Sequence, residues 1–207
     1  ADFGRHAVSY LTAEIFELHD REHFEVFGFA LRKAAKDDET RARLVRAFDH
    51  FIEVDGEPDL EIVERARGLG LDIAIDLGGH TKGSRTALFR HRVAPVQVNF
   101  LGYPGTMGAD FIDYIIADQA TIADASRHAY SERVVHLPEC FQPSDTRRAM
   151  PASDPPRAAF GLPESVGGDC SPASRNGASR CSRVSSSRCL AGVISAISFR
   201  ASVPASV

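Results

Sequence analysis

Residues 76–83 (DLGGHTKG) combine glycine with side chains that bind anions. The stretch follows an apolar run directly and carries Thr81 and Lys82 among three glycines. Glycine lets the backbone approach a ligand closely, and the free N–H groups at a helix start attract negative charge. The spacing is neither GxGxxG nor GxxxxGK[ST], which excludes the dinucleotide and P-loop fingerprints. The alternative is a tight strand-to-helix turn with a solvated Lys82.

A second glycine-rich stretch, residues 101–108 (LGYPGTMG), contains five candidate binding residues: Gly102, Tyr103, Pro104, Gly105 and Thr106. Pro104-Gly105 is typical of a type II turn, in which proline fixes one φ and glycine supplies a positive φ. Thr106 would then offer a hydroxyl and an N–H group at a helix start. The turn accounts for two of these residues and leaves Gly102, Tyr103 and Gly108 unexplained.

His6 is the candidate for acid, base or anion-binding chemistry, since it stands directly before a helix-like segment. The alternative for a lone histidine at a helix start is an ordinary surface residue. The sequence contains no HExxH, no GxSxG and no metal-spaced cysteine pair. We therefore predict no metal site, no metallohydrolase and no serine hydrolase.

Alternating helix-like and strand-like segments position these stretches. The spacing of Val8, Leu11, Ile15 and Leu18 predicts one buried helix face. Further helices are predicted over residues 41–48, over residues 59–68 with Asp59 as the N-cap, and over residues 84–92. Strands are predicted over residues 24–31, 51–54, 71–77, 96–101, 114–117 and 134–137. This alternation predicts an α/β fold with a mostly parallel sheet, whose ligand lies at the carboxyl ends of the strands.

The composition fits one ordinary domain without a membrane span. The 207 residues are 43% hydrophobic and 25% charged, and the net charge is -4. This balance favours neither nucleic-acid nor membrane-surface binding. The cysteine spacing predicts no disulfide framework, and we expect the reducing cytoplasm. The chain opens without methionine, which suggests a piece of a longer protein.

The character of the sequence changes after residue 164. Residues 166–207 contain eleven serines and five arginines, and only residues 190–199 form an apolar stretch. We predict two regions: a folded domain over residues 1–164, and a Ser/Arg-rich tail over residues 165–207 that is disordered or read from a shifted frame. A basic nucleic-acid-binding arm is the alternative for the tail, but its arginines lack aromatic neighbours to stack bases.

Six short motifs occur in one order along residues 1–164. They are DFGxH (residues 2–6), GxTKGxR (79–85), RxAPVQV (92–98), LGYPGTxG (101–108), DYIIxD (113–118) and YSE (130–132). This ordered set resembles the catalytic region of the protein O-GlcNAc transferase family, including its SPINDLY-like members.

The resemblance implies the N-terminal Rossmann-like half of a GT-B glycosyltransferase. Such enzymes move N-acetylglucosamine from UDP-GlcNAc to Ser or Thr hydroxyls of proteins, with inversion and without a metal or other cofactor. His6 corresponds to the family's histidine beside the donor sugar, and Asp76 is a second candidate for handling the acceptor's proton. Both glycine-rich loops correspond to the rim of the cleft, so they are the expected donor-binding segments.

The departures from the family limit what this chain is expected to do. The family has an apolar strand before the DFGxH motif, a second Rossmann-like half and tetratricopeptide repeats, and none of these is in the sequence. We predict a chain that is inactive alone, with a central strand missing and apolar surface open near Phe100 and Tyr103. The alternatives are a non-catalytic protein- or sugar-binding remnant, and a nucleotide-binding oxidoreductase on the same fold.

Overall fold

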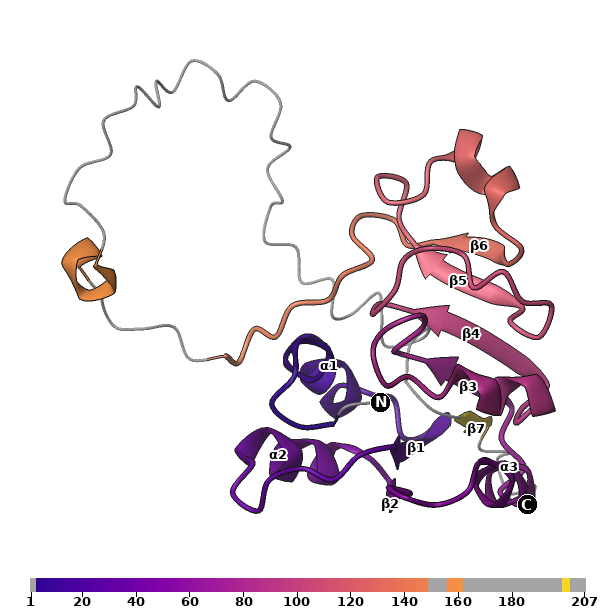
Figure 1. Ribbon diagram of the computed structural model, residues 1–207, viewed down its shortest axis with the longest axis horizontal. Coiled ribbons are helices and arrows are strands. Elements are labelled where there is room, and N and C mark those ends of the chain that lie inside the picture. Colours follow the sequence, from indigo (N-terminus) through magenta and orange to yellow (C-terminus); the bar gives the residue numbers. More distant parts are fainter. Residues whose placement is uncertain (1–2, 149–155, 162–198, 202–207) are drawn as a thin grey trace. The chain divides into compact units, whose positions relative to one another are not determined.

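The computed structural model describes residues 3–148, 156–161 and 199–201 (Figure 1). Its helices are α1 (Ala7–Glu17), α2 (Glu39–Ala47) and α3 (Asp59–Gly68), with 3₁₀ helices η1 (Thr86–His91), η2 (Asp124–Ala129) and η3 (Arg157–Phe160). Its strands are β1 (Phe24–Ala30), β2 (His50–Glu53), β3 (Ile73–Asp76), β4 (Val96–Phe100), β5 (Tyr114–Ala117), β6 (Arg133–His136) and β7 (Phe199–Ala201). Residues 1–146 and 186–207 form one compact unit, and residues 147–185, which contain η3, form another.

The described strands form one sheet in the order β2-β1-β7-β3-β4-β5-β6. β1 with β2, β3 with β4, β4 with β5 and β5 with β6 pair in parallel. The predicted α/β class with a mostly parallel sheet is therefore confirmed. Its functional consequence is that the loops after β3 and β4 leave the same edge of the sheet.

β7 is the strand that the sequence pattern did not predict. It pairs antiparallel with β1 over three residues and with β3 at one, where Phe199 lies opposite Ile73 (Figure 1). The expected apolar element at residues 190–199 lies outside the described residues except for its last residue. The central position next to β1 and β3 is occupied by this C-terminal strand.

Two helix predictions need correction. Asp59 is the first residue of α3 and not its N-cap, which is Pro58, and the Asp59 carboxylate pairs with Arg85. The helix expected over residues 84–92 is the six-residue 3₁₀ helix η1. It ends at Arg92, whose φ of 52° lies in the left-handed region and stops the helix.

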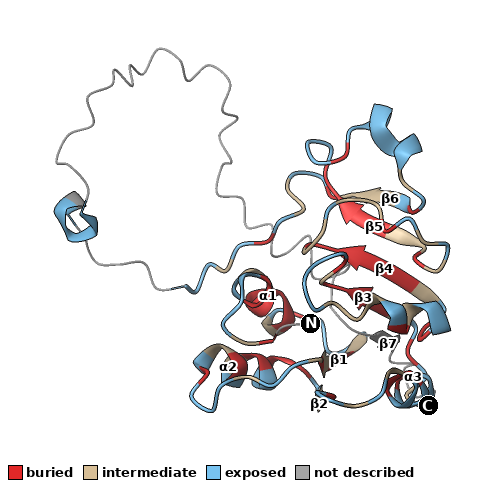
Figure 2. Cartoon of the chain, viewed as in Figure 1, coloured by how far each residue is buried: buried red, intermediate tan, exposed pale blue. Residues whose placement is uncertain are grey.

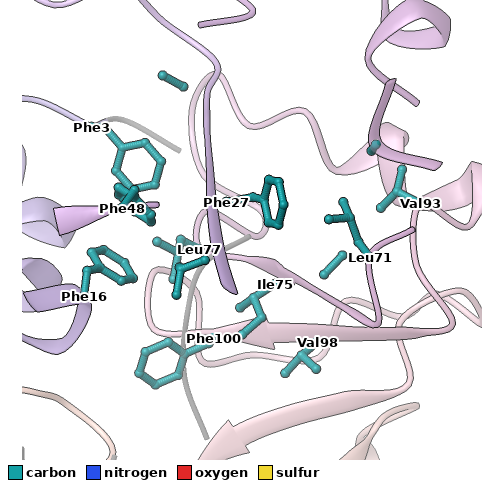
Figure 3. Packing of buried hydrophobic residues seen from close by; sticks show 14 of the residues in the cluster. Phe3, Phe16, Phe27, Phe48, Leu71, Ile75, Leu77, Val93, Val98 and Phe100 are labelled. Carbon is teal, nitrogen blue, oxygen red and sulfur yellow. The ribbon is translucent and has the colours of Figure 1, made fainter. Parts of the chain in front are cut away.

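The buried residues, red in Figure 2, lie along β3, β4 and β5 and on α1 and α2. An aromatic group joins α1 to the rest: the Phe16 ring lies 4.5 Å from Phe48, and the Phe3 ring lies 5.2 Å from Phe48 (Figure 3). Phe100 itself is fully buried, and Tyr103 is partly exposed.

The connection from β4 to β5 is held by a charged side chain at its end. Asp113 accepts hydrogen bonds from the Arg92 guanidinium, with an Nη2–Oδ1 distance of 2.8 Å, and from the Gln97 N–H group at 2.8 Å. The hydrogen bond from Arg92 lowers the pKa of the Asp113 carboxyl below its ordinary value of 3.8. The carboxylate therefore stabilises the folded state while it is ionised.

We expect Asp113→Asn to lower the free energy of unfolding at pH 7 by about 1 kcal/mol, because the pair is partly exposed. Since the folded pKa lies below the unfolded value, this stabilisation is complete above the unfolded pKa and disappears as the pH falls through the folded one. Urea unfolding from pH 7 to pH 2 should show the two proteins converging in acid. The exposed Asp55→Asn is the control, and a difference that persists unchanged in acid would contradict the assignment.

Candidate functional site

A cavity of about 460 Å³ is lined by residues from the N-terminus of α1 and from the loops after β3 and β4. Five of the predicted site residues line it: His6, Asp76, Thr81, Lys82 and Gly102. Apolar side chains complete the wall: Val8, Leu11, Leu31, Phe89, Leu101 and Phe141. The cavity thus combines a polar rim from three separate loops with an apolar floor.

The Asp76 carboxylate organises the loop that follows β3. Its Oδ1 accepts hydrogen bonds from the N–H groups of Gly78 and Gly79, at 2.8 and 3.1 Å. Its Oδ2 accepts one from the Thr86 hydroxyl at 2.8 Å, at the start of η1. Asp76 is buried, and both oxygens are engaged. The side chain therefore ties both ends of the loop together.

Thr81 and Lys82 lie on the exposed part of this loop. The Thr81 hydroxyl donates to the Gly78 carbonyl at 3.0 Å, which keeps the loop compact. Gly83 has a φ of +79°, a value that favours glycine, and it turns the chain toward η1. Lys82 is exposed and lines the cavity, so its ammonium group can reach an anion there.

His6 is the N-cap of α1, and its side chain is exposed at the cavity. Its Nδ1 accepts a hydrogen bond from the Val8 N–H group at 3.3 Å. A neutral imidazole that accepts through Nδ1 carries its hydrogen on Nε2. In this tautomer Nδ1 is engaged in capping α1, and Nε2 is the ring nitrogen that carries the hydrogen.

Two buried side chains on the α2 side fix the backbone just before His6. Asp38 caps α2 by accepting the Arg41 N–H group at 3.0 Å, and its other oxygen accepts the Arg5 N–H group at 2.8 Å. The Arg41 guanidinium donates to the Phe3 carbonyl at 2.7 Å. Neither positioning residue is recognisable from the local sequence: an aspartate before a helix indicates only a cap, and the carbonyl that Arg41 contacts belongs to Phe3, far away in the chain.

Gly102 allows the loops after β3 and β4 to touch. A Cβ atom at this position would lie 2.2 Å from the Leu77 carbonyl oxygen, far inside van der Waals contact. The preceding Leu101 has a φ of 75°, which is uncommon for a residue with a side chain. Close packing of the two backbones, and not only access for a ligand, therefore explains why residue 102 is a glycine.

The remaining predicted binding residues do not line the cavity: Tyr103, Pro104, Gly105 and Thr106. The Tyr103 ring covers Gly105, where a Cβ atom would lie 2.7 Å from the ring. Gly105 does not have a positive φ, so the predicted type II turn is wrong. The Pro104 carbonyl accepts a hydrogen bond from the Tyr130 hydroxyl at 3.2 Å. No helix begins at Thr106.

Thr106 is held by a buried carboxylate that the sequence analysis did not single out. Glu132 is 4% exposed, and it accepts the Thr106 hydroxyl at 2.8 Å and the Met107 N–H group at 2.6 Å. The YSE motif was the available signal, but nothing local indicated that its glutamate is buried. Phe141 and Gln142 also line the cavity without any signal in the sequence pattern.

Among the described residues, no group of three or more histidine, cysteine, aspartate or glutamate side chains is placed to hold a metal ion. No described helix is long and apolar enough to cross a membrane.

Comparisons with known proteins agree on one family. The sequence pattern of glycosyl transferase family 41 matches residues 1–154. A probable UDP-N-acetylglucosamine–peptide N-acetylglucosaminyltransferase, SEC, of Arabidopsis thaliana is 38% identical over 169 residues, which are 79% of this chain and 17% of the relative. The UDP-N-acetylglucosamine–peptide N-acetylglucosaminyltransferase of Caenorhabditis elegans is also 38% identical, over 68% of this chain and 12% of the relative.

The fold matches a solved structure of the same kind. An O-GlcNAc transferase mutant of Thermobaculum terrenum superimposes with a TM-score of 0.64 and 32% sequence identity, over 72% of this chain and 29% of that one. The chain therefore spans only a small part of the length of the relatives it matches. From the matched residues and the shared α/β fold, the chain belongs to glycosyl transferase family 41.

Proposed function

We propose that residues 1–164 are the N-terminal half of the catalytic domain of a protein O-GlcNAc transferase. In this proposal the chain supplies one wall of a cleft in which N-acetylglucosamine passes from UDP-GlcNAc to a Ser or Thr hydroxyl. The observation that carries it is the convergence of His6, Asp76, Thr81, Lys82 and Gly102 on one cavity. Three separate segments contribute these residues, so their meeting does not follow from closeness in sequence.

The charge of the cavity rim suits the leaving group. When the bond from the sugar C1 to the phosphate oxygen breaks, negative charge grows on UDP, and donors placed in advance at that oxygen lower the barrier. Lys82 offers a cation from the loop after β3, whereas the Thr81 hydroxyl is already used as a donor within that loop. His6 lines the same cavity from the start of α1 and can contact a phosphate or sugar oxygen there.

Proton transfer from the acceptor hydroxyl has two candidates, His6 and Asp76. Asp76 accepts three hydrogen bonds from its own loop, so a role in shaping the loop fits it better than proton uptake. His6 would need to release the hydrogen on Nε2 before it could act as a base there. We therefore propose that His6 acts first as a donor to the ligand and that Asp76 positions the loop.

The proposal requires parts that these residues do not supply. A second Rossmann-like half would carry the uridine contacts, and tetratricopeptide repeats would select the protein acceptor. The cytoplasm is the proposed location, supported by the free thiol of Cys140 and by cysteine spacings without a disulfide pattern.

We expect UDP-GlcNAc to bind weakly at this cavity and Lys82→Ala to weaken that binding about tenfold, the value of one charge-assisted hydrogen bond. Amide chemical shifts of the full chain, followed during a UDP-GlcNAc titration, would measure the dissociation constant. Lys36→Ala removes another exposed lysine that does not line the cavity and is the matched control. Equal effects of the two variants would contradict the assignment. Saturable binding of an acceptor peptide without any response to UDP-GlcNAc would favour the non-catalytic alternative.

We also expect the chain alone to transfer no measurable sugar, because it matches only 17% of the length of the Arabidopsis relative and 29% of the Thermobaculum O-GlcNAc transferase. Incubation with UDP-GlcNAc carrying a radioactive sugar and a Ser/Thr-rich peptide would test this by counting labelled peptide. Turnover that His6→Ala abolishes would show instead that these residues contain a complete active site.

A further inference from the structure

The segment that follows β6, residues 137–146, forms a strap that is attached to the fold at both of its ends. Its first residue, Leu137, donates its N–H group to the Ala117 carbonyl at 2.8 Å, directly after the pairing of β6 with β5. The Phe141 N–H group donates to the buried Asp118 carboxylate at 2.9 Å. The first half of the strap is therefore fixed to the carboxyl end of β5.

The other end of the strap is fixed to α1 and α2 through carboxylates. The hydroxyl and the N–H group of Thr146 each donate to the Glu14 carboxylate, both at 2.6 Å. The Arg43 guanidinium donates to Glu17 at 2.8 and 2.9 Å and to Asp145, with an Nη2–Oδ1 distance of 3.2 Å. Glu14 is 6% exposed and the Asp145 side chain 5%, so water competes little for these charge-assisted contacts. Glu14, Arg43 and Asp145 thus form a clasp that holds the strap.

Gln142 lies between the two attachments and lines the cavity of about 460 Å³. Its neighbours in the chain are held in place. The Phe141 ring packs edge-on against Phe100, with ring centroids 6.5 Å apart, and Pro143 is buried. Gln142 itself is exposed. The strap therefore presents one polar side chain to the cavity on a backbone that is fixed on both sides.

The carboxamide of Gln142 suits a different part of a sugar nucleotide than the ammonium group of Lys82 does. A carboxamide offers N–H donors and a carbonyl acceptor without charge, and sugar hydroxyl and acetamide groups likewise both donate and accept. Phosphate oxygens only accept, and they gain more from a cation. The two side chains on the cavity are thus complementary to the two chemical parts of UDP-GlcNAc.

We propose that Gln142 contacts the sugar of the donor and that the clasp positions it. This inference rests on the proposed function, because it takes UDP-GlcNAc as the ligand of the cavity. Gln142 is then a specificity residue for the sugar. The clasp residues Glu14, Arg43 and Asp145 do not line the cavity, so they act only through the strap.

A comparison of two nucleotides separates a sugar contact from a phosphate contact. Amide chemical shifts of the full chain give the dissociation constants of UDP-GlcNAc and of UDP. We expect Gln142→Ala to weaken UDP-GlcNAc binding about fivefold, the value of one neutral hydrogen bond, and to leave UDP binding within about twofold of the wild type. Lys82→Ala should weaken the binding of both nucleotides. Gln119→Ala is the matched control, since Gln119 is exposed and does not line the cavity.

Asp145→Ala tests the positioning role of the clasp. It should weaken UDP-GlcNAc binding about threefold, less than the loss of the contact itself, and leave UDP binding unchanged. Combined with Gln142→Ala it should cause no further loss, because both changes act on the same contact. The exposed neighbour Ser144→Ala is the control. Thr146→Val removes one hydroxyl hydrogen bond of the strap and replaces Asp145→Ala if that protein does not fold.

The outcomes distinguish this inference from the proposed function. A Gln142→Ala chain that binds both nucleotides as the wild type does, or that loses both equally, would refute the sugar contact and leave the proposed function standing. Additive losses from Asp145→Ala and Gln142→Ala would refute the positioning role. If the wild-type chain shows no saturable response to either nucleotide at the cavity, the proposed function fails and this inference fails with it.

Discussion

Gly102→Ala is expected to lower the free energy of unfolding by about 3 kcal/mol or more, because the new methyl group has no space. Its Cβ atom would lie 2.2 Å from the Leu77 carbonyl oxygen and 3.2 Å from that of Gly78. Both atoms belong to backbone, so no flexible side chain can move aside. The loops after β3 and β4 must separate, and both loops line the cavity.

The measurement is urea unfolding of the two full-length proteins, with UDP-GlcNAc binding as a second readout. Gly68→Ala is the matched control, since a Cβ atom there meets nothing within 4 Å and the residue closes α3. It should leave stability unchanged or raise it by up to about 1 kcal/mol. A Gly102→Ala protein as stable as the Gly68→Ala protein would show that the two loops do not pack as described.

Phe16→Ala is expected to cost about 3–5 kcal/mol, the range for truncating a buried aromatic side chain. Phe16 is fully buried on α1, and its ring packs against Phe48 and Phe3. The cavity left behind would weaken the attachment of α1, which carries Val8 and Leu11 into the functional cavity. Loss of stability should therefore be accompanied by weaker UDP-GlcNAc binding.

Thermal unfolding of Phe16→Ala is best compared with Leu60→Ala, because Leu60 is 59% exposed on α3. The Leu60 variant should remain within about 0.5 kcal/mol of the wild type. For a chain of this size the Phe16 variant should melt roughly 10 °C lower, at about 2–4 °C for each kcal/mol. A small loss at Phe16 would mean that α1 is held mainly by polar contacts at its ends.

Periodicity predicted the regular elements well, because one buried face repeats along each of them. The strand over Tyr114–Ala117 has its predicted bounds, and the helix with Val8 and Ile15 on one face begins beside His6 as expected. The strand-to-loop order also placed Asp76, Thr81 and Lys82 at one sheet edge. These predictions need only the local pattern of apolar residues and the general geometry of parallel strands. A single sequence is therefore sufficient for them.

The roles of individual polar residues were harder to predict, because they depend on partners far away in the chain. Gly105 looked like the second residue of a type II turn, but the Tyr103 ring over it sets the local conformation. Thr106 looked like a helix cap and is instead bonded to Glu132, 26 residues later. The short sequence window from which a cap or a turn is predicted does not contain both members of such a pair.

β7 is the clearest example of an element that depends on distant partners and so cannot be predicted from local sequence. A three-residue strand that pairs with residues near the opposite end of the chain produces no periodic signal of useful length. The resemblance predicted a missing central strand, and it gave no reason to expect an antiparallel segment from a Ser/Arg-rich region at that place. The composition of a segment describes its average character, whereas pairing needs only a few residues.

The pairing of Val26 with Phe199 also has a kinetic consequence. The two residues are 199 - 26 = 173 positions apart, so this contact closes almost the whole chain into a loop. Closing long loops costs entropy before any hydrogen bond forms, and sheets that depend on distant partners fold slowly. The two halves of the sheet, β1 with β2 and β3 to β6, can each assemble from nearer neighbours. Joining them through β7 should be a late, slow phase of refolding, during which both inner edges stay exposed to other chains.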